Sequence, residues 1–288
     1  MTDQTRRHDV FEILGHETRF AILEALGEAG PLSFTALHDR VPGKDSGRFN
    51  YHLGRTVGSF VEERDDGYAL TAAGRRVYGA VLAGRFDKHH EEGTVETDAG
   101  CTDCGGPLEV RFEPDRVGVV CSTCDAVMTR PTVPPGVFAE WPREAAAEVI
   151  ARWTTARALT ESVGLCPSCS GRVDRRAVLP DEELAPEWFD GETWGAVVVV
   201  ADCRRCGQST HAVPEVAVLH HPRVASFHYD RGVDVRTTPF WAIEWLDWGT
   251  SDLVSVDPLR IAVPVSLDDV RRIFVFGRDL TLVGEYGA

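Results

Sequence analysis

The chain has 288 residues, with 45 acidic and 30 basic side chains and a formal net charge of −15 at pH 7. It has no run of about 18 apolar residues, and its start lacks the apolar stretch of a signal peptide, so we expect a cytoplasmic protein without membrane contact. The acidic balance argues against nucleic-acid binding by the chain as a whole. However, residues 1–85 hold 11 basic and 12 acidic side chains, whereas residues 86–288 hold 19 and 33. The N-terminal part is therefore the one compatible with nucleic acid.

Residues 1–86 predict a small domain of closely spaced helices and one hairpin. Ser33, Asp45 or Ser46, and Thr71 are suitable helix N-caps. A turn sequence, Asp65-Asp66-Gly67, separates two short strand-like runs, as in a hairpin. The expected helices span 9–15, 16–27, 33–40, 45–58 and 71–85, and the expected strands span 61–64 and 68–70.

The helix expected at 45–58 has one apolar stripe and one polar face. Phe49, Leu53 and Val57 recur at i, i+4 and i+8, which turns them to the core, and His52 is interpreted as a packed core histidine. Arginine and asparagine suit base edges in the major groove, while serine and tyrosine suit phosphate, although an ordinary solvated face is an equally open alternative. The candidate DNA-binding residues are Ser46, Arg48, Asn50, Tyr51 and Arg55 on this helix and Arg64 on the hairpin.

All eight cysteines fall in four C-x-x-C pairs, which favours metal over disulfides in a reducing compartment. Sixteen residues separate the first two pairs, a spacing typical of a zinc site, and thirty-three separate the last two. We therefore predict two structural zinc ions, although pairing across the modules remains open. Four thiolates leave no position for a catalytic water. The predicted ligands are Cys101, Cys104, Cys121 and Cys124 in one site, and Cys166, Cys169, Cys203 and Cys206 in the other.

The rest of the chain divides at changes in composition. Residues 87–99 are polar and acidic and predict a linker. A zinc-ribbon-like module follows at 100–135, then a connecting segment at 136–164 with a helix at about 142–163, a second module at 165–212 with a strand at 196–201, and an α/β region at 213–288 for effector binding or interaction. In this last region we expect a helix from Pro222, strands at 253–256, 260–265, 272–276 and 280–286, and a turn at 277–279.

All seven tryptophans lie beyond residue 140: Trp141, Trp153, Trp188, Trp194, Trp241, Trp245 and Trp248. Core packing around small metal modules is the favoured interpretation, with an effector pocket or a partner surface as the alternatives. Phe240, Trp241, Trp245 and Trp248 have helical spacing, which predicts one buried helix face.

Three motifs carry a resemblance to a known family: His16-Glu-Thr-Arg-Phe-Ala-Ile-Leu, Phe49-Asn-Tyr-His-Leu, and Asp66-Gly-Tyr-Ala-Leu-Thr-Ala-Ala-Gly-Arg. In this order they resemble the ArsR-like winged helix-turn-helix regulators of the haloarchaeal type. An acidic chain with only two lysines, Lys44 and Lys88, is also similar to proteins of halophilic archaea. The resemblance implies binding of double-stranded DNA as a homodimer and regulation of transcription. The cysteine-bearing helix of the family's metal sensors is not matched, since residues 33–40 contain no cysteine.

The sequence thus predicts an α+β chain with an N-terminal winged helix-turn-helix, two zinc-ribbon-like modules and a β-rich C-terminal region, acting as a transcriptional regulator. The alternative is a transcription-machinery adaptor, since a winged helix followed by a zinc ribbon also resembles the large subunit of archaeal initiation factor E, which binds RNA polymerase. An enzyme is disfavoured, because we find neither a phosphate-binding glycine loop nor a cysteine left free as a nucleophile.

Overall fold

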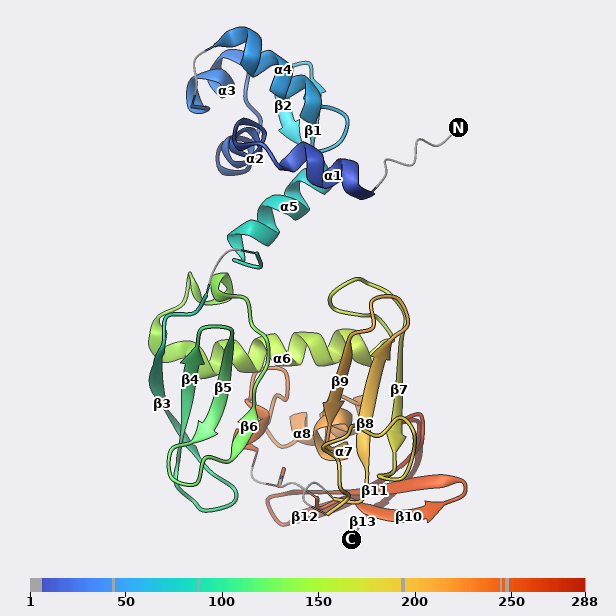
Figure 1. Cartoon of the computed structure of the whole chain (residues 1–288). Coiled ribbons are helices and arrows are strands. Elements are labelled where there is room, and N and C mark those ends of the chain that lie inside the picture. The colour runs from blue at the N-terminus through green and yellow to red at the C-terminus, as the bar shows by residue number, and fades with distance from the viewer. Residues whose placement is uncertain are drawn as a thin grey trace. The chain divides into compact units, whose positions relative to one another are not determined.

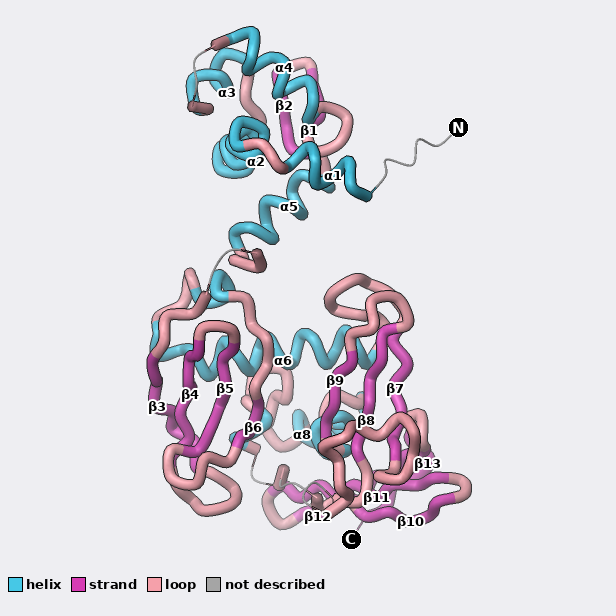
Figure 2. The backbone as a smooth tube through the Cα atoms, viewed as in Figure 1, coloured by secondary structure: helices cyan, strands magenta, loops and turns pink. Residues whose placement is uncertain are grey.

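The computed structural model describes residues 7–42, 45–86, 89–192, 195–243, 245–246 and 249–287. The chain forms two compact units, which we call unit 1 (Met1–His89 with Pro134–Val137) and unit 2 (His90–Val133 with Phe138–Ala288). The described residues have a mixed α+β architecture with four small antiparallel sheets (Figures 1 and 2). Over these same ranges, every helix falls short of the length and apolar character that a bilayer crossing requires.

Unit 1 contains the predicted helices and hairpin in the predicted order. Ser33 and Thr71 cap their helices by accepting from the backbone N–H three residues on, and Asp45, not Ser46, caps the helix at 46–56. His16 caps its helix through its ring nitrogen. The elements are α1 (Arg7–Leu14), α2 (Glu17–Ala29), α3 (Phe34–Arg40), α4 (Ser46–Thr56), β1 (Val61–Arg64), β2 (Gly67–Leu70) and α5 (Ala72–Leu82).

The core of unit 1 joins α2 to α4. Ile22 and Leu23 of α2 pack with Phe49 and Leu53 of α4, and all four are at most 1% exposed. A methyl group at Gly67 would lie 2.2 Å from the carbonyl oxygen of Leu32, and its φ of +134° also favours glycine. The hairpin is therefore held close to the segment between α2 and α3.

Unit 2 begins with a four-stranded sheet and continues through a helix to a three-stranded one. The first sheet has the order β3-β4-β5-β6 and the second the order β7-β8-β9. Figure 1 shows α6 running from the first sheet to the second. These elements are β3 (Gly93–Gly100), β4 (Pro107–Glu113), β5 (Arg116–Cys121), β6 (Val127–Thr129), the 3-10 turn η2 (Arg143–Ala145), α6 (Ala146–Ser162), β7 (Val173–Val178), β8 (Val198–Cys203) and β9 (Ser209–Ala212). The 3-10 turn η1 (Pro135–Phe138) lies mostly in the segment assigned to unit 1.

The linker predicted at 87–99 is wrong in its second half. Residues 93–100 form β3, an edge strand paired antiparallel with β4, and residues 87–88 lie outside the described residues. An edge strand is held by backbone hydrogen bonds along one side, so it does not require apolar side chains. Because β3 carries mostly polar residues, the sequence pattern did not indicate it.

The C-terminal region shares its core with the second cysteine module. Ala177 of β7 and Val199 of β8 pack in one apolar cluster with Val224, Val263 and Phe274. The predicted strands and their turn are all present. The elements are α7 (Pro214–Val218), α8 (Pro222–Tyr229), the 3-10 turn η3 (Phe240–Ala242), β10 (Asp252–Val256), β11 (Leu259–Leu267), β12 (Val270–Gly277) and β13 (Leu282–Gly287).

The helix expected from the aromatic spacing at 240–248 is not formed in the described residues, which contain only the turn η3 there. Trp241 and Trp245 are nevertheless buried, and they lie on an irregular segment over the C-terminal core. Trp194 and Trp248 lie outside the described residues. Helical spacing over nine residues was too short a pattern to separate a helix from a buried irregular segment.

Candidate metal centres

The structure brings the eight cysteines into two clusters of four. Site 1 consists of Cys101, Cys104, Cys121 and Cys124, and site 2 of Cys166, Cys169, Cys203 and Cys206, with the sulfurs of each cluster within 4.8 Å of one another. The two pairs of each module therefore share one cluster, as the simpler sequence interpretation predicted, and no pairing across modules occurs. Strand pairing explains this, because β3 with β4 and β5 with β6 bring the two turns of site 1 to one end of their sheet.

The sulfur separations fit a tetrahedral ion and not disulfides. In site 1 the Cys101 and Cys124 Sγ atoms are 3.8 Å apart, and those of Cys104 and Cys121 are 3.5 Å apart. The corresponding separations in site 2 are 3.7 and 3.5 Å. A disulfide has a bond of about 2.05 Å, whereas four sulfurs about 2.3 Å from a central ion lie about 3.8 Å apart. Each site can therefore hold one metal ion.

The four C-x-x-C turns share one backbone pattern. In each turn the first cysteine donates its N–H to the carbonyl five residues on, and its own carbonyl accepts from the N–H four residues on, with distances between 2.7 and 3.1 Å. The residue four positions after the first cysteine has a positive φ in every case. These residues are Gly105, Asp125, Ser170 and Gly207, with φ values of 72°, 58°, 56° and 73°.

Backbone N–H groups also point at the sulfurs. Gly106 donates to Cys104, Thr123 to Cys121 and Arg205 to Cys203, over 3.3 to 3.4 Å. The amides of Cys206 and Arg205 lower the pKa of Cys203 to about 6, against the effect of burial. For Cys121, burial raises the pKa, but the amides of the same turn outweigh it and lower the pKa to about 6. The turn amides therefore favour the thiolate form of these two cysteines, and thiolate is the form that binds metal.

Two glycines leave room for the sulfurs. A methyl group at Gly171 would lie 3.1 Å from the sulfurs of both Cys169 and Cys203, and one at Gly106 would lie 3.2 Å from that of Cys104. In each pair the first cysteine is buried and the second is more exposed. Four cysteines fill all positions of a tetrahedral ion, so the arrangement suits a structural metal and offers no position for a reacting water.

The structure places the predicted DNA-binding residues on the surface of unit 1. Ser46, Arg48, Asn50, Tyr51 and Arg55 of α4 and Arg64 of β1 are all exposed. Two of these arginines have intramolecular partners: Arg55 lies 3.6 Å from Glu12, and the Arg64 Nε donates to Glu62 over 3.0 Å.

His52 is 5% exposed, as predicted for a core histidine. Its ring lies 3.9 Å from that of His16, so the two histidines connect α4 to the start of α2. The sequence pattern did not indicate this role of His16, which was predicted as the first residue of the helix at 16–27 and is instead its N-cap.

Both cysteine sites fall within one family match. Residues 98–282, more than half of the chain, match a family model described as a domain of unknown function, DUF7351. The chain belongs to this family. Residues 7–81 match a second model, also described as a domain of unknown function, DUF7347. The DUF7351 span takes in both sites and the strands from β4 to β12, and the other takes in unit 1 from α1 nearly to the end of α5. No curated protein and no solved structure matches the chain.

Proposed function

We propose that this protein is a DNA-binding transcriptional regulator that acts as a homodimer, with a structural zinc ion in each cysteine site. The observation that carries the proposal is the outer face of α4. Its two apolar anchors, Phe49 and Leu53, are 1% exposed, which fixes the helix against α2. The opposite face carries hydrogen-bonding side chains directed at solvent, in an order of helices and hairpin that resembles a winged helix-turn-helix.

The chemistry of this face suits a major groove. Arg48 can donate two hydrogen bonds to a guanine and Asn50 can pair with an adenine. Tyr51 is 63% exposed, and its ring lies edge-on to that of His52 with the centroids 5.2 Å apart. An exposed phenol hydroxyl on this face suits a contact with DNA. We therefore assign base contacts to Arg48 and Asn50 and backbone contacts to Ser46 and Tyr51.

The hairpin β1–β2 contributes little to phosphate binding in this proposal. Arg64 is paired with Glu62, and Glu63, Asp65 and Asp66 are exposed beside it. Since these carboxylates repel phosphate, the affinity of unit 1 depends on hydrogen bonds and shape more than on charge.

Zinc is the proposed metal because the donor set is four thiolates in a tetrahedral arrangement, the set typical of structural zinc. Small sheets such as β7–β9 bury little apolar surface near their turns. In site 2, the local apolar cluster consists of three cysteines with Val173 and Ala201. Metal–sulfur bonds then stabilise this end of the sheet, where apolar packing is slight.

The proposal is tested by retaining fragmented genomic DNA on the purified, zinc-loaded protein in molar KCl and sequencing what is bound. We expect a short inverted-repeat site, since two copies related by a twofold axis read the same half-site twice. Even recovery across the genome, from folded protein with two zinc ions, would contradict the proposal and favour an adaptor that binds RNA polymerase.

The role of α4 is tested by Arg48→Ala and Asn50→Ala, each measured on the enriched site. Each is expected to weaken binding about 5- to 100-fold, the range for loss of one two-bond base contact. Arg116→Ala is the matched control, because Arg116 is an exposed, ion-paired arginine of unit 2. Equal losses from all three variants would show that α4 does not read the bases.

A further inference from the structure

Six arginines lie in the second cysteine module or at its junction with the C-terminal sheet, within the strongly acidic part of the chain. Arg172 and Arg204 both bond Asp174 of β7. Asp174 pairs in register with Asp202 of β8, which accepts from Arg176 over 2.6 Å. We call this set the arginine band: Arg172, Arg176, Arg204, Arg205, Arg260 and Arg278.

The band continues from β7 to the turn between β12 and β13. The Arg278 guanidinium donates to the carbonyl of Ala177 in β7 over 3.3 Å, and the N–H of Ala177 donates to the carbonyl of Arg278 over 2.7 Å. Arg260 of β11 is the register partner of Gly277, next to Arg278. The band thus extends from the C-x-x-C turns of site 2, which we call the tip, along β7 to the turn between β12 and β13. Six residues of strand span about 20 Å.

The carboxylates near the arginines are unevenly distributed along the band. Asp174 and Asp202 are held as described above, Glu182 bonds Arg278 over 2.7 Å, and Asp279 accepts from the N–H and hydroxyl of Thr281. Asp181 and Glu183 are exposed on either side of Glu182, so the charges are balanced at the Arg278 end. The basic excess lies at site 2, where Arg172, Arg204 and Arg205 face Asp174. Residues 86–288 as a whole have an excess of fourteen acidic side chains, so this end of the band is a local reversal of charge.

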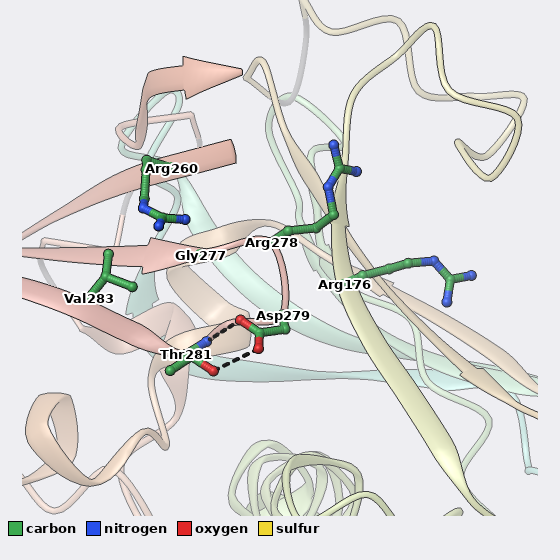
Figure 3. Close-up of a pocket in the computed structure, with 7 residues that line it drawn as sticks. All are labelled: Arg176, Arg260, Gly277, Arg278, Asp279, Thr281 and Val283. Atoms are coloured by element: carbon green, nitrogen blue, oxygen red, sulfur yellow. Dashed lines mark hydrogen bonds between the residues drawn. The ribbon is translucent and has the colours of Figure 1, made fainter. Parts of the chain in front are cut away.

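The arginines do not surround a small ligand. A hollow of about 500 Å³ is lined by Arg176, Arg260 and Arg278 together with Asp279, Thr281 and Val283. Figure 3 shows that the three guanidinium groups point in different directions and not at one common point. Arg172 and Arg204, nearer the tip, have side chains that are 72% and 62% exposed. Spread, outward-facing cations suit an extended polyanion.

Metal binding does not account for the arginines at the tip. Arg204 and Arg205 stand between the cysteines of one turn of site 2, where the turns of site 1 have Thr102-Asp103 and Ser122-Thr123. Both sites have the same four donors and the same turn geometry. Because site 1 forms without arginine in its turns, the metal does not require these two arginines. Arg204 bonds Asp174, and the Arg205 guanidinium donates to the carbonyl of Cys169 over 3.2 Å. Both side chains remain exposed and can make a further contact.

We propose that the arginine band binds the phosphate backbone of nucleic acid, as a second contact on the DNA that unit 1 reads. Guanidinium groups bond phosphate oxygens in pairs and remain charged at any physiological pH. The extent of the band matches several consecutive phosphates, and the outward direction of its side chains suits a backbone that passes over the surface. The idea that the polyanion is the same DNA rests on the proposed function of unit 1.

The test measures binding of the full-length, zinc-loaded protein to a fluorescent 30-base-pair duplex of random sequence, from 0.5 to 2 M KCl. Arg204→Ala/Arg205→Ala is expected to weaken binding about tenfold at the lowest salt and to reduce the slope of log Kd against log [KCl] by about 1 to 2, since each lost phosphate contact removes about 0.9. Arg204→Lys/Arg205→Lys should restore most of the slope. Arg116→Ala/Arg152→Ala removes two ion-paired arginines elsewhere in unit 2 and should leave both values unchanged.

The outcomes separate this inference from the proposed function. If the alanine pair binds the random duplex like the parent protein while Arg48→Ala/Asn50→Ala loses the enriched site, the band is not a nucleic-acid surface and the function of unit 1 stands. If the alanine pair loses the random duplex while Arg48→Ala/Asn50→Ala still binds the enriched site like the parent protein, the band holds and the assignment of α4 is wrong. An RNA duplex of the same length, bound more tightly than DNA through the band, would overturn the idea of a shared DNA. Zinc content and circular dichroism of each variant confirm that it is folded.

Discussion

At the scale of single residues, two histidines of unit 2 show that the contribution of a buried side chain to stability depends on its hydrogen-bond partners. His228 is fully buried, its Nδ1 lies 2.7 Å from the carbonyl oxygen of Val224, and its Nε2 lies 2.8 Å from the Nε1 of Trp245. Since the indole can only donate, the neutral ring must donate from Nδ1 and accept at Nε2. His220, by contrast, has a buried Nδ1 without a partner.

Replacing these histidines by leucine should therefore give different results. His228→Leu leaves the N–H of Trp245 unpaired in the core and is expected to lower the free energy of unfolding by about 1–3 kcal/mol. His220→Leu removes a nitrogen that already lacks a partner and should change the free energy by less than about 1 kcal/mol. Urea denaturation at pH 7.5 measures both. A loss from His220→Leu as large as that from His228→Leu would contradict this explanation.

Ser170 has a left-handed backbone conformation that its side chain disfavours. Its φ is +56°, at the position where two of the other three cysteine turns have glycine. Ser170→Gly is expected to raise the free energy of unfolding by about 1 kcal/mol, because glycine adopts this conformation without a steric penalty. Ser168→Gly, in the same turn but without a positive φ, is the control and should not stabilise. Thermal unfolding of the zinc-loaded proteins measures the difference.

At the scale of elements, each cysteine site closes one end of one sheet. The first cysteine of the second pair is the last residue of β5 in site 1 and of β8 in site 2. The preceding hairpin, β4–β5 or β7–β8, sets its distance from the other pair. The repeated turn supplies local geometry, and the strand register decides which two turns meet. The two sites should therefore load independently.

Changing Cys101, Cys104, Cys121 and Cys124 together to serine is expected to lower the metal content from two zinc ions to one, with site 2 still loaded. Serine is a poor zinc ligand, while the four cysteines of site 2 remain together on β7–β9. Native mass spectrometry measures the stoichiometry. Loss of both ions from a variant that keeps its secondary structure would show that pairs are shared across the modules.

At the scale of the whole molecule, histidines that lose solvent on folding contribute to a loss of stability in acid. Burial lowers the pKa of six histidines: His52, His90, His211, His220, His221 and His228. For His220 it lowers the pKa to about 4. Above pH 6.5 these rings are neutral in both the folded and the unfolded chain. Below it, the unfolded chain takes up protons that the folded chain does not, so stability falls as the pH falls from 6.5 towards 4.

We expect the free energy of unfolding to decrease steadily as the pH falls from 6.5 to 4. His220 alone should account for about 3 kcal/mol of this decrease. His220→Leu should flatten the decrease by that contribution. Urea denaturation at several pH values measures it, with metal content followed in parallel because thiolates also take up protons in acid. An unchanged pH slope in the variant would show that His220 is not protonated on unfolding.

The sequence by itself determined the features that depend on neighbours along the chain. The two-residue spacing of each cysteine pair identified the ligands, Ser33 and Thr71 marked helix starts, and Asp65-Asp66-Gly67 marked a hairpin. Each is a matter of local backbone geometry within a few residues. The polar edge strand β3 was not predicted. It is held by hydrogen bonds to the backbone of β4, and these require no particular pattern of side chains.

Only the tertiary structure decided which distant residues meet. It assigned the cysteine pairs to their sites, because strand register and not spacing fixes that choice. It placed Trp241 and Trp245 in the core without a helix, and stacked His16 on His52. It also brought arginines from residues 172 to 278 close to one another in an otherwise acidic unit. Contacts of this kind depend on how the sheets pack against one another, and the packing of sheets cannot be read from a local sequence pattern.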